Sequence, residues 1–392
     1  MFSNRLHWDQ RPNRLSQTIE SHRRKGAAIL DLTESNPTHA GFTYPQEIVS
    51  ALAAPGMLVY EPAPAGLVSA RQAVASYYAE RGQPVDPSRV LLTASTSEAY
   101  AYLFKLLCNP GDEVLVPRPS YPLFEFLANL ESVVVRQYSL AYRGEWTIDL
   151  DSIAAAVSAR TRAIILVNPN NPTGSYVKPV ELEALVKRAA GRGIALISDE
   201  VFYDFALIPD IQRVSLASAE GCLSFSMSGL SKVAGLPQMK LGWIVVGGPD
   251  RLRAEAMEKL EWIADTYLSV GAPVQHAAAR LLEAGAAIQA QIRQRTAENL
   301  SAGRTTLAGS AANILHVEGG WYITVRVPCL RSEEEWAVGL LTGEGVLVQP
   351  GFFYDFESEA FLVISLLTSP EVFREGVLRL RRYIELGQRL LG

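Results

Sequence analysis

Short apolar runs alternate with amphipathic stretches through the middle of the chain. Apolar, β-branched runs predict strands at residues 90–93, 113–116, 133–138, 163–167, 194–198, 222–226 and 241–246. The spacing of apolar residues predicts helices at 95–107, 121–130 and 178–190. This alternation favours an α/β fold with a large, mostly parallel sheet covered by helices. Ligands of such sheets bind beyond the carboxyl ends of the strands.

The rest of the chain has a different pattern. From residue 251 to about 308 the spacing is helical and long. A smaller α+β unit follows, with strands expected near 314–317, 321–327, 346–348 and 361–366 and a last helix from about Pro370. Residues 1–43 lack a core of their own, so we expect them to pack on this unit. The predicted division is an N-terminal segment (1–43), a large domain (44–270), and a linking helix with a small domain (271–392).

Composition narrows the class of protein. The chain has 392 residues, of which 48% are hydrophobic and 20% charged, as in ordinary globular proteins. Its net charge of −5 argues against a nucleic-acid partner, and no apolar run approaches the length of a membrane span. The polar N-terminus and three widely spaced cysteines favour a cytoplasmic protein without disulfides. The cysteines and histidines show no metal-binding spacing.

Lys232 is the first candidate for chemistry. It follows a predicted strand and lies among small residues, which leave room for a bulky group beside its amine. A buried lysine has a lowered pKa and becomes a nucleophile toward aldehydes. The alternative is a surface lysine after a strand.

Two polar candidates follow other predicted strands. Asp199 ends an apolar run, and a buried carboxylate requires a partner such as a protonated pyridine nitrogen. A helix cap or a loop salt bridge is the alternative. Residues 168–174, Asn-Pro-Asn-Asn-Pro-Thr-Gly, predict a rigid turn that holds the Asn171 amide at the mouth of the sheet. A plain turn is the alternative there.

Weaker signals come from hydroxyl and aromatic residues. Ser95, Thr96 and Ser97 lie where a strand becomes a helix, and a helix N-terminus with hydroxyl side chains binds phosphate. Ser95 and Glu98 also match a capping box, which is a structural role. Tyr121 could stack on a flat ring, although an aromatic residue there is more often part of a core.

Taken in order, these residues resemble the class I/II aminotransferases, which are pyridoxal-phosphate (PLP) enzymes of fold type I. The resemblance extends from residues 32–37 to the last helix. It implies a seven-stranded-type, mostly parallel sheet domain with a smaller α+β domain. It also implies a ping-pong transfer of an amino group from an amino acid or amine to a 2-oxo acid. Such enzymes are homodimers with active sites built from both subunits.

The resemblance also implies residue roles. Lys232 would form the Schiff base with PLP, and Asp199 would hold the pyridine nitrogen. Asn171 would bind a ring oxygen of the cofactor and, with Ser35, the substrate carboxylate. Tyr121 would stack on the ring. The implied phosphate ligands are Ser95, Thr96, Ser97, Ser231, Lys240 and, from the neighbouring subunit, Tyr60.

The chain departs from the family at four positions, one of which is Gly229, where the family often has a serine three residues before the lysine. Lys240 replaces an arginine and lacks its bidentate fork. Phe202 replaces a tyrosine, and Tyr203 beside it is expected to point to the other face. Val363 stands where the family's arginine for the substrate carboxylate falls. Arg326 is the first candidate to replace that arginine and Arg118 the second, with a structural role as the alternative for each.

Other functions remain open at this point. A PLP-dependent C–S β-lyase has the same fold, and fold does not choose between the two reactions. A non-catalytic ligand-binding relative is a third hypothesis, which the presence of Lys232 and Asp199 disfavours. A nicotinamide dehydrogenase is disfavoured because no G-x-G-x-x-G follows a strand.

Overall fold

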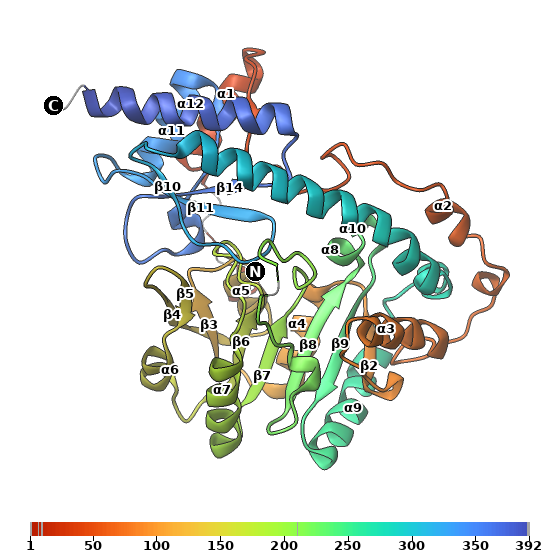
Figure 1. Ribbon diagram of the computed structural model, residues 1–392. Helices are drawn as coiled ribbons and strands as arrows, with labels where there is room; N and C mark the ends of the chain where they lie inside the picture. Colours follow the sequence, from red (N-terminus) through yellow and green to blue (C-terminus); the bar gives the residue numbers. More distant parts are fainter. Residues whose placement is uncertain (1, 7, 9–10, 210, 390–392) are drawn as a thin grey trace.

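The structure is a computed structural model, and it describes residues 2–6, 8, 11–209 and 211–389. A large unit built on an eight-stranded sheet lies below a smaller unit in Figure 1, and the long helix α10 (Ala272–Leu307) passes between them. Among the described helices, none is both long and apolar enough to cross a membrane.

The large sheet is mostly parallel, as predicted. Its strand order is β2 (Val90–Thr93), β9 (Gly242–Gly247), β8 (Ser224–Gly229), β7 (Ala195–Asp199), β6 (Thr161–Val167), β3 (Glu113–Arg118), β4 (Val134–Tyr142) and β5 (Trp146–Ile148). The strands from β8 to β4 are parallel neighbours, whereas β9 runs antiparallel to β8 and to β2. The sequence pattern predicted seven of these strands. The eighth, β5, is a three-residue strand that forms a hairpin with β4.

Helices cover both faces of this sheet. One face packs against α4 (Thr96–Leu107), α5 (Leu123–Leu130) and α9 (Asp250–Asp265). The other face packs against α6 (Leu150–Ala156) and α7 (Pro179–Arg192) at one end and against α3 (Val68–Glu80), α8 (Leu230–Val233) and α10 at the other. The central strands of the sheet, which are β3, β6, β7, β8 and β9, are therefore buried on both faces. This explains their continuous apolar runs.

The smaller unit is α+β, as expected. Its antiparallel sheet has the order β10 (Asn313–Ile314), β11 (Tyr322–Arg326), β14 (Phe361–Ser365) and β13 (Gln349–Pro350). Helices α11 (Glu333–Glu344) and α12 (Pro370–Arg389) complete it.

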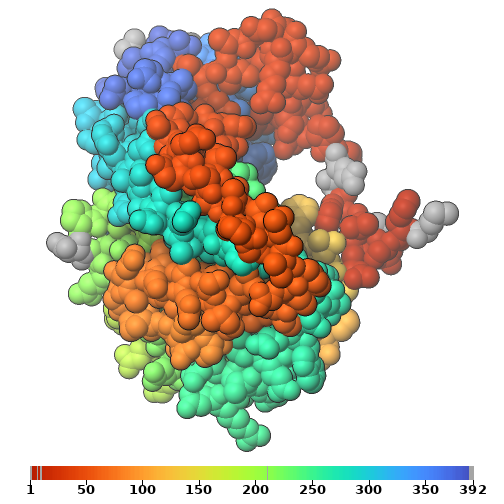
Figure 2. Space-filling model, turned by 90° about the vertical axis from the view of Figure 1, so that its right-hand side faces the viewer, coloured from red at the N-terminus to blue at the C-terminus, as the bar shows by residue number. Residues whose placement is uncertain are grey.

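The N-terminal segment contacts both units. Strand β1 (Leu30–Asp31) pairs with β12 (Val346–Leu347), and α1 (Arg14–Arg24) packs on α11. Arg5, in contrast, donates a hydrogen bond to the carbonyl of Leu130 in the large unit. Figure 2 shows the segment that follows β1, in orange, lying across α10. Within this segment, α2 (Glu47–Ala51) contacts α10. The division at residues 43 and 270 stays a prediction.

The long helical pattern from 251 to about 308 corresponds to two helices, α9 and α10, separated by residues 266–271. Leu268 has a positive φ of 45° there. Pro273 lies in the first turn of α10, where a proline is tolerated because that N–H has no partner within the helix.

Candidate active site

The polar candidates gather at one edge of the large sheet. Parallel strands present their carboxyl ends to the same edge. Tyr121 follows β3, Asn171 follows β6, Asp199 ends β7 and Lys232 follows β8, and these four strands are parallel. The fold therefore brings together residues that are up to 111 positions apart in the sequence, between Tyr121 and Lys232.

Lys232 lies in the short helix α8, directly after β8. Its Nζ is 4.8 Å from the ring centroid of Trp321 and 5.4 Å from that of Phe202. Burial lowers the pKa of Lys232 from 10.5 to about 8, and the charge of Asp199 partly opposes this shift. Near neutral pH an appreciable part of this amine is therefore uncharged and nucleophilic.

Asp199 is a partly buried carboxylate at the end of β7. Its Oδ2 accepts a hydrogen bond from the Tyr100 hydroxyl at 3.3 Å, and its Oδ1 accepts one from the Val201 N–H at 3.3 Å. Burial raises the pKa of Asp199 to about 6, while these hydrogen bonds and Lys232 act in the opposite direction. Both hydrogen bonds are long, so the carboxylate is held in place but remains able to accept a stronger cationic donor.

The turn after β6 holds Asn171 as predicted from its prolines. Asn168 anchors the turn, since its Nδ2 donates to the Val214 carbonyl at 2.7 Å and its Oδ1 accepts from the Val177 N–H at 3.0 Å. The Oδ1 of Asn171 is buried and has no hydrogen-bond partner among the described residues. A buried polar atom without a partner is costly, and such atoms mark sites where a ligand supplies the partner.

The N-terminus of α4 has both a capping role and free donors. The Ser95 hydroxyl caps the helix by accepting from the Glu98 N–H at 3.1 Å. The Glu98 carboxylate in turn accepts from the Ala94 N–H at 2.6 Å. Ser95 is thus engaged by its own helix, and Thr96 and Ser97, both partly buried, are the hydroxyl residues of the first turn.

Two further candidates for the same anion lie close to this helix end. A Cβ on Gly242, at the start of β9, would come within 3.1 Å of the Ser95 carbonyl carbon, so the two backbones nearly touch. Lys240 precedes Gly242 by two residues, is exposed, and adopts a left-handed conformation with φ of 52°. Ser231 precedes Lys232 in α8. Helix N–H groups, hydroxyls and one ammonium group therefore form a donor set suited to a phosphate.

The side chains of Phe202 and Tyr203 lie in two different environments. The Phe202 ring faces Lys232 and packs on Trp321 with centroids 5.1 Å apart. Tyr203 points elsewhere, because its hydroxyl accepts from Gln83 and its ring contacts Arg81 and Arg213. The hydroxyl that the family has beside the lysine is thus missing here, and Tyr203 does not replace it.

The wall formed by the small sheet carries no arginine at Val363. Register places Tyr322, Thr324, Val363 and Gln349 on one face of β11, β14 and β13. The opposite face, with Ile323 and Leu362, belongs to the core.

Hydroxyl groups dominate this wall. The Tyr322 hydroxyl hydrogen-bonds with Ser35, and burial raises its pKa to about 12. The Tyr354 hydroxyl donates to Gln349 Oε1. Val363 is itself buried, so tyrosine and glutamine side chains make up the wall around it.

Neither alternative arginine makes a hydrogen bond or ion pair with the residues of this wall in the described part of the chain. Arg326 lies on the same face of the sheet, two residues beyond Thr324, and is exposed at the end of β11. Arg118 donates from Nε to the Asp355 carbonyl at 3.0 Å and lies 4.0 Å from the Glu357 carboxylate. Arg118 thus ties the large sheet to a loop of the small unit, which is the structural role named as its alternative.

Tyr121 and Tyr60 are both exposed in the single chain, at 47% and 80% of their surface. Tyr121 lies near the buried hydroxyls of Tyr322 and Tyr354, whose pKa values it influences. Tyr60 contacts no other site candidate within the described chain.

Sequence reasoning missed several residues of the site. Tyr100, which reaches Asp199, lies four residues after Thr96 on α4, and its helical spacing was an available signal. Trp321, Tyr322 and Gln349 come from a unit remote in sequence, and no local pattern marked them.

Comparison with known proteins agrees with the fold and shows the family. The family model described as aminotransferase class I and II matches residues 27–380. The fold and this sheet edge thus define a class I and II aminotransferase, and the chain belongs to that family.

The sequence identities between this chain and individual relatives are modest. The glutamate-pyruvate aminotransferase AlaA of Escherichia coli is 34% identical over 257 residues, which are 64% of this chain and 63% of that relative's length. AlaA of Haemophilus influenzae is 28% identical over 377 residues and covers 92% of this chain and 91% of the relative. The crystal structure of an aminotransferase from Escherichia coli superposes with a TM-score of 0.84, at 25% identity, over 98% of both chains. The S-alkyl-thiohydroximate lyase SUR1 of Arabidopsis thaliana is 34% identical over 189 residues, or 40% of its length.

Proposed function

We propose that this protein is a PLP-dependent aminotransferase that moves an amino group from an amino acid or amine to a 2-oxo acid. One observation carries the proposal: a lysine with a pKa of about 8 lies near a partly buried carboxylate at the carboxyl edge of a parallel sheet. Family membership supports the reaction class, and the names of the AlaA relatives support amino and oxo acids as substrates.

The donor set fits PLP group by group. Asp199, which is partly buried, has no cationic neighbour other than Lys232 among the described residues, and a ring nitrogen would supply one. The Asn171 amide would donate from its Nδ2 to the ring oxygen. Thr96, Ser97, Ser231 and Lys240 would hold the phosphate, and Tyr121 would lie against the ring. When bound, PLP supplies the electron sink that lets an amino substrate lose its Cα proton.

The residues of the chain perform the remaining tasks. Lys232, partly neutral near pH 8, would first bind the cofactor and then act as the base that takes the Cα proton at its Nζ. Trp321 and Phe202 shield that Nζ from water, which favours the neutral amine. Tyr100 orients Asp199 and thereby acts as a positioning residue.

The substrate side differs from a site built on an arginine. Val363, Thr324 and Gln349 present no cation, and Arg326, two residues beyond Thr324 on the same face, is exposed to solvent. An α-carboxylate would meet Asn171, Ser35 and the Tyr322 hydroxyl instead. We therefore propose that the carboxylate adds little to binding, and that amines without it are accepted as donors.

The active unit is proposed to be a cytoplasmic homodimer. Leu58, Val59 and Tyr60 form an apolar ridge that is 83%, 60% and 80% exposed, respectively. Tyr267 and Leu268 are exposed apolar residues as well. Exposed apolar surface of this extent is typical of a protein interface. A second copy would cover the ridge and receive Tyr60 at its phosphate site.

The test is a half-reaction screen on the purified protein loaded with PLP. Amino acids and amines are added singly, and absorbance follows conversion of the cofactor to its amino form. Aminotransferase activity predicts conversion by at least one donor and recovery on addition of a 2-oxo acid. Release of ammonia and a keto acid without any acceptor would instead establish the β-lyase, which the partial similarity to SUR1 keeps as the second candidate.

A further inference from the structure

A second polar cavity lies on the other side of the segment that carries Phe202. It has a volume of about 460 Å³ and is bounded by α3, the loop after β7, α8 and α10. Whereas Phe202 faces Lys232, the next two residues, Tyr203 and Asp204, line this cavity. Its size falls in the range of small-molecule binding sites.

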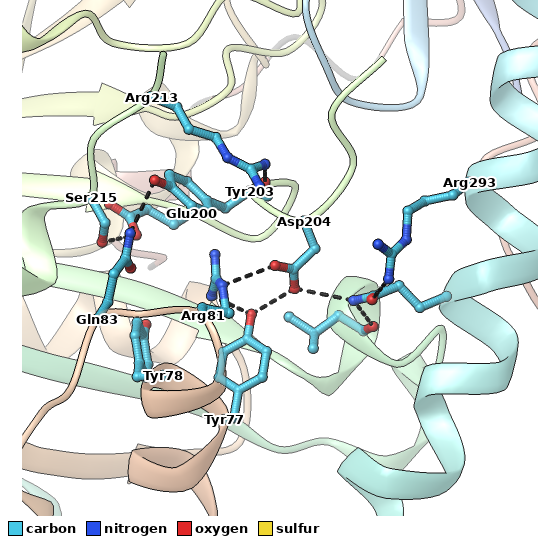
Figure 3. A network of polar contacts seen from close by, with 12 residues as sticks. Tyr77, Tyr78, Arg81, Gln83, Glu200, Tyr203, Asp204, Arg213, Ser215 and Arg293 are labelled. Atoms are coloured by element: carbon cyan, nitrogen blue, oxygen red, sulfur yellow. Dashed lines mark hydrogen bonds and ion pairs between the residues drawn. The ribbon is translucent and has the colours of Figure 1, made fainter. Parts of the chain in front are cut away.

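The carboxylate at the centre of the cavity is already satisfied. Asp204 Oδ1 lies 3.0 Å from Arg81 Nε, and its Oδ2 accepts from the Tyr77 hydroxyl at 2.7 Å. Figure 3 shows Asp204 between Arg81 and Tyr77, with Arg213 and Arg293 on either side. Arg81 also stacks on Tyr77 and Tyr203, at 4.7 and 4.6 Å from the ring centroids. Arg81 and Asp204 thus neutralise one another.

Arg213 and Arg293 have no carboxylate partner among the described residues. The Nη1 of Arg213 donates to the Tyr176 hydroxyl at 3.2 Å and to the Tyr203 carbonyl. Arg293 donates to the neutral Gln289 Oε1. The described lining residues include three arginines, Asp204 and the exposed Glu80. The buried Glu200, beyond the lining, also interacts with Arg81, so Arg81 is the arginine that the buried carboxylates neutralise.

We propose that this cavity binds a small dicarboxylate, with one carboxylate on Arg213 and the other on Arg293. The free edge of each guanidinium matches the two oxygens of a carboxylate, and such paired hydrogen bonds are strong. Two separated guanidinium groups favour an anion with two charged ends over one with a single carboxylate.

The geometry connects this cavity to the lysine. Gln289 Nε2 donates to the Val233 carbonyl at 2.9 Å and to Asp204 Oδ2 at 3.1 Å, while its Oε1 accepts from Arg293. A ligand that binds Arg293 would break the hydrogen bond from Arg293 to Gln289 Oε1. The Gln289 side chain would then be less restrained, which would weaken its hydrogen bond to the Val233 carbonyl, next to Lys232. The dicarboxylate would therefore act as an effector of the proposed active site.

The probe for this site is succinate, titrated by calorimetry into the cofactor-loaded protein at constant ionic strength. The variants are Arg213→Gln, Arg293→Gln and their combination, with Arg251→Gln on the exposed surface of α9 as the matched loss of charge. Loss of a charge-assisted pair costs about 1.5–3 kcal/mol, so each single variant should bind succinate roughly 10- to 100-fold more weakly. Arg251→Gln should bind as the wild type does, and propionate should bind far more weakly than succinate.

The outcomes separate this cavity from the candidate active site. Succinate affinity that is unchanged in the double variant would overturn the proposal, as would absence of binding to the wild type. An equal loss in Arg251→Gln would assign the effect to overall charge and overturn it too. Circular dichroism and thermal melting identify a misfolded variant, and Arg213→Lys, which keeps the charge, should retain part of the affinity.

Discussion

Replacement of Asp199 by asparagine should stabilise the protein stripped of PLP while weakening its hold on PLP. Burial raises the Asp199 pKa from 3.8 to about 6, so its ionised form is costly in the folded protein. Below pH 3.8 the carboxyl group is protonated in both states and costs nothing. As the pH rises from 3.8 to 6 the unfolded chain ionises first, and the folded state loses stability. Above pH 6 the loss is complete.

The magnitude follows from the size of the shift. About two pKa units at 1.36 kcal/mol each amount to roughly 3 kcal/mol at neutral pH. Asparagine removes this cost but weakens the hydrogen bonds from Tyr100 and Val201, at about 1 kcal/mol. The net gain in the free energy of unfolding is therefore about 2 kcal/mol at pH 7.5, and it should shrink as the pH falls through 6 toward 3.8.

The assay is urea unfolding of the PLP-free protein, wild type and Asp199→Asn, at pH 7.5 and 4.5. Asp265→Asn, which changes an exposed aspartate of α9, is the control and should alter the free energy of unfolding by less than about 0.5 kcal/mol. A variant that is no more stable than the wild type at pH 7.5, or a difference independent of pH, would refute the reasoning.

Three further predictions follow from the site. The rate at which PLP-free protein captures PLP should rise with pH around a midpoint near 8, because burial lowers the Lys232 pKa to that value; a midpoint near 10.5 would contradict it. Tyr60→Phe should weaken PLP binding roughly 10- to 100-fold without unfolding the chain, and sedimentation should show a dimer; an active monomer would argue against the shared site. Phenylethylamine should drive the half-reaction at a rate within about tenfold of phenylalanine, and Arg326→Ala should leave that ratio unchanged; a strong preference for phenylalanine that Arg326→Ala abolishes would restore Arg326 as the anchor.

Much of the fold could be predicted because each signal was local. The apolar runs of β6, β7 and β8 are buried on both faces, so the pattern marked them within three residues at each end. Strand β5 was not predicted because three residues are too few to show a periodic pattern. The break between α9 and α10 depends on Pro273 and on the positive φ of Leu268, which interrupt an otherwise helical pattern.

The site was predictable in part for the same reason. Lys232, Asp199 and Asn171 each follow a strand, so parallel topology brings them to one edge whatever their sequence separation. The wall around Val363 was not predictable, because the register of β11, β13 and β14 decides which side chains share a face. Tyr322 and Gln349 could be assigned to this wall only once that register was known, and the role of Arg326, on the same face two residues beyond Thr324, stays a prediction.

The most direct test of the central claim is the site of attachment of PLP. Wild-type protein and Lys232→Ala are each incubated with PLP, reduced with borohydride, digested and analysed by mass spectrometry. Lys187→Ala, in helix α7, serves as a matched control. The account predicts a pyridoxyl group on the peptide containing Lys232 in the wild type and in the control. It predicts no stoichiometric adduct on any peptide of Lys232→Ala. A stoichiometric adduct at another lysine, or one that persists in Lys232→Ala, would contradict it.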